Sequence, residues 1–281
     1  MTDLLRQRTT LAAPSVRLSG VGLHTGRPSW IQFQPAPSGA GVVFVDDASG
    51  VSIPALSGNV ADTSRCTQLA AGGLVLQTVE HVLSALAGCG VDDAVVRFSG
   101  PEAPILDGSA APFAGAIRAA GVATQTPAQP APVMRLAGPV LVQDDHGGSV
   151  LALPADDASY TVVLNYPEHA YIGTQAAAFD PSAQSYENEI APARTYGFMT
   201  ELEGLRARGL ALGATEENAL ALGEQGYLGE RRFDNELARH KLLDLIGDLS
   251  LVGRPVAARF VAIKPGHTLN SRMARALLAA A

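Results

Sequence analysis

The chain has 281 residues, 47% of them hydrophobic and 17% charged, so it can bury a core and is not a disordered polyelectrolyte. Its formal net charge is −7, and no run of Lys and Arg could follow a phosphate backbone, which argues against nucleic-acid binding. The two cysteines, Cys66 and Cys89, are too few for a disulfide framework or a thiolate metal site.

No targeting or membrane segment is expected. The first ten residues, MTDLLRQRTT, lack the apolar core of a signal peptide. The most apolar stretch, residues 74–91, is interrupted by Glu80 and His81, and none reaches the roughly 20 apolar residues of a spanning helix. We therefore expect a cytoplasmic monomer without a transmembrane segment, and peripheral contact with a membrane stays open.

The first 125 residues predict an α+β unit. Strand-like segments come first, with a tight glycine-rich turn, GVGLHTG, at 20–26. A helix over 78–87 ends at Gly88, and a second helix over 110–120 follows a strand at 94–98. The strand-like segments lie at 16–18, 29–33 and 41–45.

A second α+β unit follows a linker. Residues 124–132, TQTPAQPAP, contain three prolines and no periodic pattern, so we expect domains over 1–125 and 133–281. The second domain predicts strands, then a loop-rich stretch, two helices and a last strand. The strands are expected at 133–142, 149–153, 160–165 and 257–263, and the helices at 200–208 and 234–251.

The two halves share a pattern. EHVLSALAGCGVDDAVVRF, from Glu80, and RHKLLDLIGDLSLVGRPVAARF, from Arg239, each run from a His through an amphipathic helix and a turn into a strand. Such units are common, so chance similarity is the more frequent explanation. If the repeat is real, it predicts two similar domains that pack helix against helix, each bringing a His to the interface.

The helix over 234–251 carries a candidate metal site. In HKLLDLIGD, His240, Asp244 and Asp248 follow one another at intervals of four, which places them on one helix face. A His and a carboxylate at this spacing can share a zinc ion, although structural ion pairs look the same in sequence. The intervening residues are Leu and Ile, so the polar face approaches a buried surface, where such groups need partners or a metal.

The other histidines differ in how well their sequence context supports a catalytic or metal-binding role. His81 follows Glu80, so one side chain could ligate a metal while the other acts as a general base, and no H-E-x-x-H motif is present. His267, in KPGHTLN after a predicted strand, is a candidate general acid on a loop, where a solvated surface His is the commoner case. His146 and His169 are assigned no chemistry.

Together these segments resemble the UDP-3-O-acyl-N-acetylglucosamine deacetylases of lipid A biosynthesis. The similar stretches occur in family order along nearly the whole chain, which makes coincidence negligible. They are GVGLHTG, TVEHVLSALAG, PEAPILDGSAAPF, ARTYGFM, RGLALG, RHKLLDLIGDL and the KPGH turn. The resemblance implies an α+β fold of two domains with similar topology, whose helices are sandwiched between two β-sheets, with the active site at the domain junction.

The resemblance also implies a zinc amidase. The family's zinc ligands correspond to His81, His240 and Asp244, and its general base corresponds to Glu80. Its zinc ion activates water for hydrolysis of the N-acetyl group.

Further catalytic roles follow from the same resemblance. The catalytic His corresponds to His267, with Asp248 beside it to favour the imidazolium form. The hydroxyl that helps to hold the oxyanion corresponds to Thr195.

The expected ligand is a UDP-3-O-acyl-N-acetylglucosamine. Lys241 and Lys264 are expected to meet sugar and phosphate oxygens, Tyr196 and Phe198 to pack on the hexosamine, and Tyr166 to stack on uracil. The stretch at 168–192 corresponds to the insert that forms the family's fatty-acyl passage.

Departures from the family pattern leave alternatives open. ATEENAL follows RGLALG where GSLDNAI is more typical, and insert positions such as Tyr171 do not align clearly. A zinc amidohydrolase acting on another N-acyl amino sugar is one alternative. A non-catalytic binding paralogue is the other, and intact Glu80 and His267 argue against it.

Overall fold

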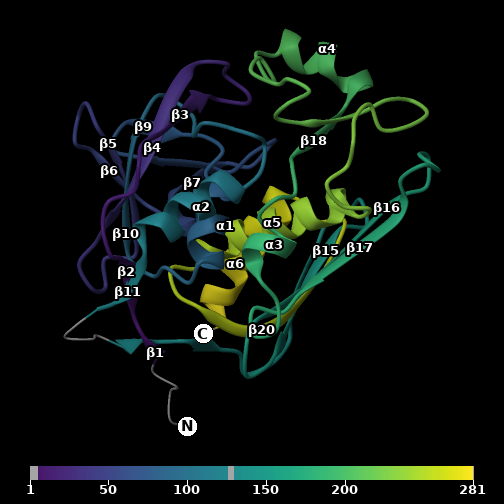
Figure 1. Cartoon of the computed structure of the whole chain (residues 1–281). Helices are drawn as coiled ribbons and strands as arrows, with labels where there is room; N and C mark the ends of the chain where they lie inside the picture. The colour runs from purple at the N-terminus through teal and green to yellow at the C-terminus, as the bar shows by residue number, and fades with distance from the viewer. Residues whose placement is uncertain (1–5, 126–129, 281) are drawn as a thin grey trace.

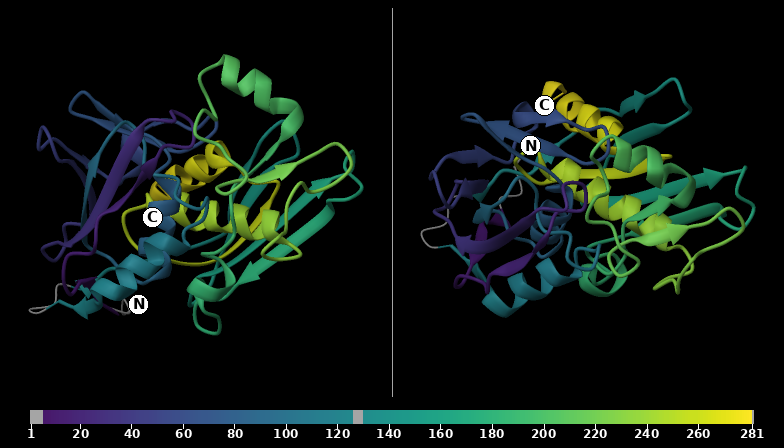
Figure 2. Two further views of the ribbon diagram at one scale, coloured as in Figure 1. Left: turned by 45° about the horizontal axis from the view of Figure 1, so that its top comes forward. Right: turned by 90° about the horizontal axis from the view of Figure 1, so that it is seen from above.

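The computed structural model describes residues 6–125 and 130–280. Two large β-sheets lie on either side of a layer of helices, as Figure 1 and Figure 2 show. The expected α+β sandwich is therefore confirmed.

The first sheet has five strands in the order β3-β4-β10-β5-β6. Its central strand, β10, runs antiparallel to β4 and parallel to β5. Helix α1 (Glu80–Gly88) leads into β10, and α2 (Ala111–Ala120) follows it. The strands are β3 (Leu18–Val21), β4 (Pro28–Pro35), β5 (Val42–Asp46), β6 (Ser52–Pro54) and β10 (Ala94–Ser99).

The second sheet repeats this arrangement in the order β14-β15-β20-β16-β17. Its central strand, β20, runs antiparallel to β15 and parallel to β16, and β13 (Met134–Arg135) also pairs with it. Helix α5 (Glu236–Ser250) leads into β20, and α6 (His267–Ala279) follows it. The other strands are β14 (Val140–Gln143), β15 (Ser149–Pro154), β16 (Ser159–Tyr166), β17 (Gly173–Phe179) and β20 (Val256–Ile263).

The repeat seen in the sequence is thus a repeat of topology. In each half, the strand that follows a buried helix, β10 or β20, lies at the centre of the sheet between two pairs of antiparallel strands. Each of these central strands has one antiparallel and one parallel neighbour. The two equivalent helices, α1 and α5, pack directly against each other between the sheets. His81 and His240 lie on these two helices, so the prediction that each half brings a His to the interface is confirmed.

Aliphatic side chains make up most of the core, and its largest fully buried side chains include Phe33, Phe44, Phe113 and Phe260. In β10 buried and half-buried residues alternate, so one face of the strand points toward the helices. Helix α5 is buried around most of its circumference, as expected for a helix covered on more than one side. Its buried residues include His240, Asp244 and Asp248.

Short elements complete the fold. Helix α4 and the parallel strands β18 and β19 form an excursion that rises from the helical layer in Figure 1. The excursion comprises β18 (Tyr196–Phe198), α4 (Met199–Ala207) and β19 (Leu220–Leu222). The remaining elements are β1 (Arg6–Gln7), β2 (Thr9–Leu11), η1 (Ser57–Asn59), β7 (Val60–Asp62), β8 (Gln68–Ala71), β9 (Leu74–Leu76), β11 (Val122–Thr124), β12 (Pro130–Ala131) and α3 (Tyr186–Glu189).

The centre of the expected linker, residues 126–129, lies outside the described residues. Its flanks lie in short strands, because β11 pairs with β2 and β12 pairs with β1. The division into domains over 1–125 and 133–281 therefore stays a prediction.

Two elements differ from the sequence expectations. The stretch at 168–192 is not simply loop-rich, since it contains β17, in which alternate residues are buried as in a half-buried strand. His267 does not lie on a loop but begins helix α6, whose Leu269, Met273 and Leu277 are buried at helical spacing. Within the described residues, no helix has both the length and the apolarity to cross a lipid bilayer.

Candidate metal centre and surrounding cavity

Both halves of the chain line one cavity of about 850 Å³. All but one of the site residues expected from the sequence line it, and the exception, Asp248, lies behind His267. The expected residues in its wall are Glu80, His81, Tyr166, Thr195, Tyr196, Phe198, His240, Lys241, Asp244, Lys264 and His267.

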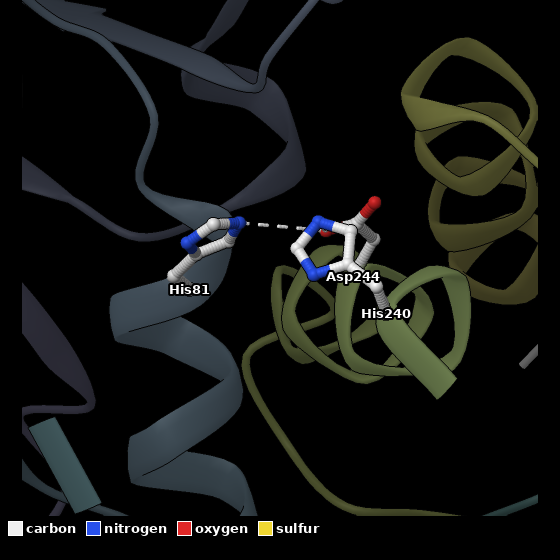
Figure 3. Close-up of side chains that lie close together, drawn as sticks. All are labelled: His81, His240 and Asp244. Atoms are coloured by element: carbon white, nitrogen blue, oxygen red, sulfur yellow. Dashed lines mark ion pairs between the residues drawn. The ribbon is translucent and has the colours of Figure 1, made fainter. Parts of the chain in front are cut away.

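His81, His240 and Asp244 form a buried cluster (Figure 3). One ligand atom from each lies within 4.8 Å of the others. Nε2 of His240 lies 3.4 Å from Oδ1 of Asp244, and Nε2 of His81 lies 3.8 Å from the same oxygen. The helix spacing brings His240 and Asp244 together, whereas packing of α1 on α5 brings His81 to them.

The two imidazoles of this cluster are in the neutral form that can bind a metal ion through a ring nitrogen. Nδ1 of His240 lies 3.1 Å from the carbonyl oxygen of Ala193, which leaves Nε2 free to ligate. Burial and the neighbouring His240 lower the pKa of His81 to about 3, so its imidazole is neutral. Burial also lowers the pKa of His240.

The carboxylate of Asp244 is divided between two roles. Lys241 donates to its Oδ2 at 2.7 Å, whereas its buried Oδ1 faces the two imidazoles and has no hydrogen-bond partner among the described residues. An unpartnered buried carboxylate oxygen is costly unless a cation meets it. Two neutral nitrogens and one oxygen fit a divalent transition-metal ion with room for further ligands.

Glu80 lies beside this cluster on α1. Its Oε2 accepts a hydrogen bond from the backbone N–H of Thr67 at 3.0 Å, which leaves Oε1 for the cavity. Burial is the main reason that the pKa of Glu80 rises to about 8. A carboxyl group with such a pKa is suited to accept and release a proton near neutral pH.

His267 lies opposite Glu80, with Nε2 3.9 Å from Oε1 of Glu80. Its Nδ1 donates to Oδ2 of Asp248 at 3.0 Å. Burial opposes a charge on the ring, but Asp248 and Glu80 outweigh it and raise the pKa of His267 to about 9. The imidazole is therefore cationic at neutral pH and presents Nε2–H to the cavity.

Thr195 and three aromatic residues line another part of the cavity. The backbone N–H of Thr195 donates to the carbonyl oxygen of Gly108, which ties this wall to the first half of the chain. The hydroxyl groups of Tyr166 and Tyr196 lie 2.9 Å apart, and the Tyr166 and Phe198 rings meet edge to face with centroids 5.8 Å apart. The three rings thus form one connected wall.

Two lysines add positive charge. Burial disfavours the charge of Lys241, but Asp244 outweighs this effect and raises the pKa of Lys241.

Three non-glycine residues in the cavity wall have a positive φ. They are Lys264 (47°), Thr78 (56°) and Ala211 (54°). Backbone strain of this kind often accompanies functional sites.

The apolar part of the cavity does not come from residues 168–192. No residue of that stretch lines the cavity among those that the structure describes, because β17 instead extends the second sheet beside β16. Most of the apolar lining comes from the excursion that carries α4, so this cavity does not support an acyl passage at 168–192, which stays a prediction. The apolar lining residues of the excursion include Phe198, Met199, Leu202, Leu205, Ala211, Ala214, Ala219, Leu220 and Ala221.

The turn GVGLHTG supplies a cavity residue to which the sequence reasoning gave no role, His24. Buried Glu102 holds this turn, since its carboxylate accepts from the backbone N–H groups of His24 and Thr25 and from the hydroxyls of Thr25 and Thr78. Gly22 is required there, because a Cβ would lie 2.2 Å from Oε2 of Glu102. His24 has no acidic neighbour in the sequence, so only the motif could have drawn attention to it.

Known proteins resemble the chain over nearly its whole length. The model of the family described as UDP-3-O-acyl N-acetylglycosamine deacetylase matches residues 8–279. A Chlamydia caviae protein named UDP-3-O-acyl-N-acetylglucosamine deacetylase is 42% identical over 94% of this chain and 94% of that protein. A relative of the same name from Myxococcus xanthus is 43% identical over 93% of this chain and 83% of that protein.

A third relative of that name, from Pseudomonas entomophila, is 40% identical over 98% of this chain and 91% of that protein. These matches span both halves of the fold and both walls of the cavity. The chain therefore belongs to the UDP-3-O-acyl N-acetylglycosamine deacetylase family.

Proposed function

We propose that this chain hydrolyses the N-acetyl group of UDP-3-O-[(3R)-3-hydroxyacyl]-N-acetylglucosamine, giving the free amine and acetate, as the committed step of lipid A biosynthesis. One observation carries the proposal: the cluster of His81, His240 and Asp244 opens into the same cavity as Glu80 and His267. The names of the relatives support the substrate.

Zinc is the proposed metal, and His81, His240 and Asp244 would hold it. Two imidazole nitrogens and one carboxylate oxygen suit zinc and leave a position open, as catalytic zinc sites require. When bound, zinc supplies Lewis acidity and a nucleophile at neutral pH.

Glu80 is the proposed general base. Thr67 holds Oε2 in the wall, so Oε1 faces the cavity and can take a proton from the attacking water. The pKa of Glu80, raised by burial to about 8, brings its basicity close to that needed for this transfer.

His267 is the proposed general acid, and Thr195 assists it. Asp248 keeps His267 cationic and orients it, so Nε2–H can protonate the departing amine nitrogen. The same positive charge, together with the hydroxyl of Thr195, would stabilise negative charge that develops on the amide oxygen.

The remaining walls suit the parts of a nucleotide sugar. Lys241 and Lys264 would meet sugar and phosphate oxygens, Tyr196 and Phe198 would pack on the hexosamine, and Tyr166 would stack on uracil. All five residues line the cavity.

The fatty chain would lie along α4. Leu202 and Leu205 are one helical turn apart and both line the cavity, whereas no residue of α4 is fully buried. Burial of an acyl chain there contributes about 0.8 kcal/mol per CH₂ group.

We also propose that this protein acts as a cytoplasmic monomer, and peripheral contact of the protein with a membrane stays open.

The test is acetate release from UDP-3-O-acyl-N-acetylglucosamine, with and without a chelator. We expect chelator-sensitive release that falls by several orders of magnitude with UDP-N-acetylglucosamine, because remote binding energy supports the chemical step. Leu205→Asp should impair the acylated substrate selectively, whereas Glu203→Ala, an outward-facing control on the same helix, should not.

Two results would reject the proposal. Equal turnover of acylated and unacylated substrates would favour an amidohydrolase for another N-acyl amino sugar. Tight binding of the acylated substrate without acetate release would favour a non-catalytic binding protein.

A further inference from the structure

Thr67 connects the two groups that are proposed to move protons. It is fully buried in the first half of the chain, directly before β8, and it does not line the cavity among the described residues. Its backbone N–H donates to Oε2 of Glu80 at 3.0 Å. Its hydroxyl donates to Oδ1 of Asp248 at 2.5 Å, across the interface between the two halves.

The hydroxyl of Thr67 is one of three side-chain groups that donate hydrogen bonds to the carboxylate of Asp248. Oδ2 of Asp248 accepts from Nδ1 of His267 at 3.0 Å and from Nδ2 of Asn270 at 2.9 Å. The other oxygen, Oδ1, accepts from Thr67. Because Asp248 is fully buried, removal of this hydroxyl would leave a buried carboxylate oxygen without a partner.

The backbone of Thr67 positions Glu80 in turn. Besides the bond from its N–H to Glu80, its carbonyl oxygen accepts from the N–H of Val79, the residue before α1. Thr67 therefore ties down the start of α1 and one oxygen of Glu80. The other oxygen faces Nε2 of His267 at 3.9 Å.

We propose that Thr67 is a positioning residue that sets the distance between Glu80 and His267, through its backbone on one side and through Asp248 on the other. The inference rests on the proposed function, because these two groups matter as base and acid of that reaction. Small displacements of such groups cost large factors in rate.

Substitutions of the Thr67 side chain distinguish its hydroxyl bond to Asp248 from its backbone bond to Glu80. Thr67→Val is nearly isosteric and removes the bond to Asp248 but keeps the backbone bond to Glu80, whereas Thr67→Ser keeps both. Tyr186→Phe is the matched control, because the hydroxyl of Tyr186 is also buried and bonds Ser84 on α1, outside the cavity.

The measurements are kcat, KM and Tm of each variant with the acylated substrate. We expect Thr67→Val to lower kcat by about 10- to 100-fold with little change in KM, since hydrogen bonds to charged groups are the strong ones. Thr67→Ser should retain most of kcat. Tyr186→Phe should lower Tm without lowering kcat.

An Asp248→Ala background gives the decisive comparison. If Thr67 acts through Asp248, Thr67→Val should change kcat little in that background, because the two effects are coupled. Wild-type kcat in Thr67→Val, or the same fold loss in both backgrounds, would overturn the proposal.

A crystal structure of Thr67→Val tests the inference apart from activity. We expect the Asp248 carboxylate to turn and its hydrogen bond with His267 to lengthen. An unmoved pair would overturn the inference, whatever the wild-type substrate is. Failure of the wild-type protein to release acetate would instead count against the proposed function.

Discussion

Gly247 of α5 lies against the backbone of Glu80 on α1, so closely that a Cβ on Gly247 would be 2.1 Å from the carbonyl oxygen of Glu80. No other residue fits this crossing without moving one of the helices. The contact lies one turn from Asp244 and next to His81. The close approach of the two helices therefore sets the distance across the candidate metal site.

Gly247→Ala is expected to destabilise the protein and impair the site. Its methyl group would meet backbone atoms, which cannot rotate away, so the cost should be at least about 1–3 kcal/mol. Thermal unfolding measures the effect. Gly115→Ala on α2 is the control, because a Cβ there would meet no described atom within 4 Å beyond the adjacent helix backbone, and Ala favours a helix by about 0.5–1 kcal/mol. Equal Tm values for the two variants would contradict this account of the crossing.

The ligand cluster predicts about one tightly bound divalent ion per chain. His81→Ala and Asp244→Ala should each lower the affinity sharply, because each removes one of three protein ligands. Metal analysis after dialysis against a weak chelator measures the change. Glu80→Gln should retain the ion, since Glu80 is not in the cluster. Full metal content in a His81→Ala, His240→Ala double variant would refute the assignment.

The pKa values predict a bell-shaped dependence of kcat on pH. Glu80 acts when deprotonated, so the rate should rise with pH through its pKa, which burial raises to about 8 and a nearby metal ion lowers again. His267 acts when protonated, so the rate should fall as pH rises through its pKa of about 9. His267→Ala should lower kcat by roughly 10²–10⁴-fold and abolish the alkaline limb. An unchanged alkaline limb in His267→Ala would exclude this residue as the acid.

Substitution of Glu102 is expected to lower the stability of the fold, although Glu102 is not one of the groups proposed to react. Glu102→Gln would turn an amide donor toward the N–H and hydroxyl donors of the GVGLHTG turn, leaving buried donors unpaired. A loss of about 1–3 kcal/mol is expected in chemical denaturation. Asp46→Asn, whose carboxylate accepts bonds in an exposed turn, should change stability by less than about 0.5 kcal/mol. Similar losses in both variants would show that burial of Glu102 is not what matters.

Local patterns predicted much of this fold. The alternating and helical patterns located most long elements to within a few residues, because local geometry decides which side chains share a face. Helix α6 was missed although Leu269, Met273 and Leu277 follow a helical period. The KPGH turn drew attention to a loop instead. Strand β17 was missed because its alanines carry little strand preference, and pairing with β16 determines its conformation.

The sequence by itself determined that His240 and Asp244 share a helix face, because helix periodicity alone dictates this relation. The internal repeat suggested a His from each half of the chain, and the packing of α1 on α5 was needed to establish it. Only the tertiary structure decided that α1 packs on α5 closely enough to bring His81 to Asp244, and that Thr67 reaches Asp248, 181 residues away. It also placed most of the apolar lining of the cavity on the excursion that carries α4. Contacts between distant segments depend on how whole helices and sheets pack, and no local pattern in the chain encodes them.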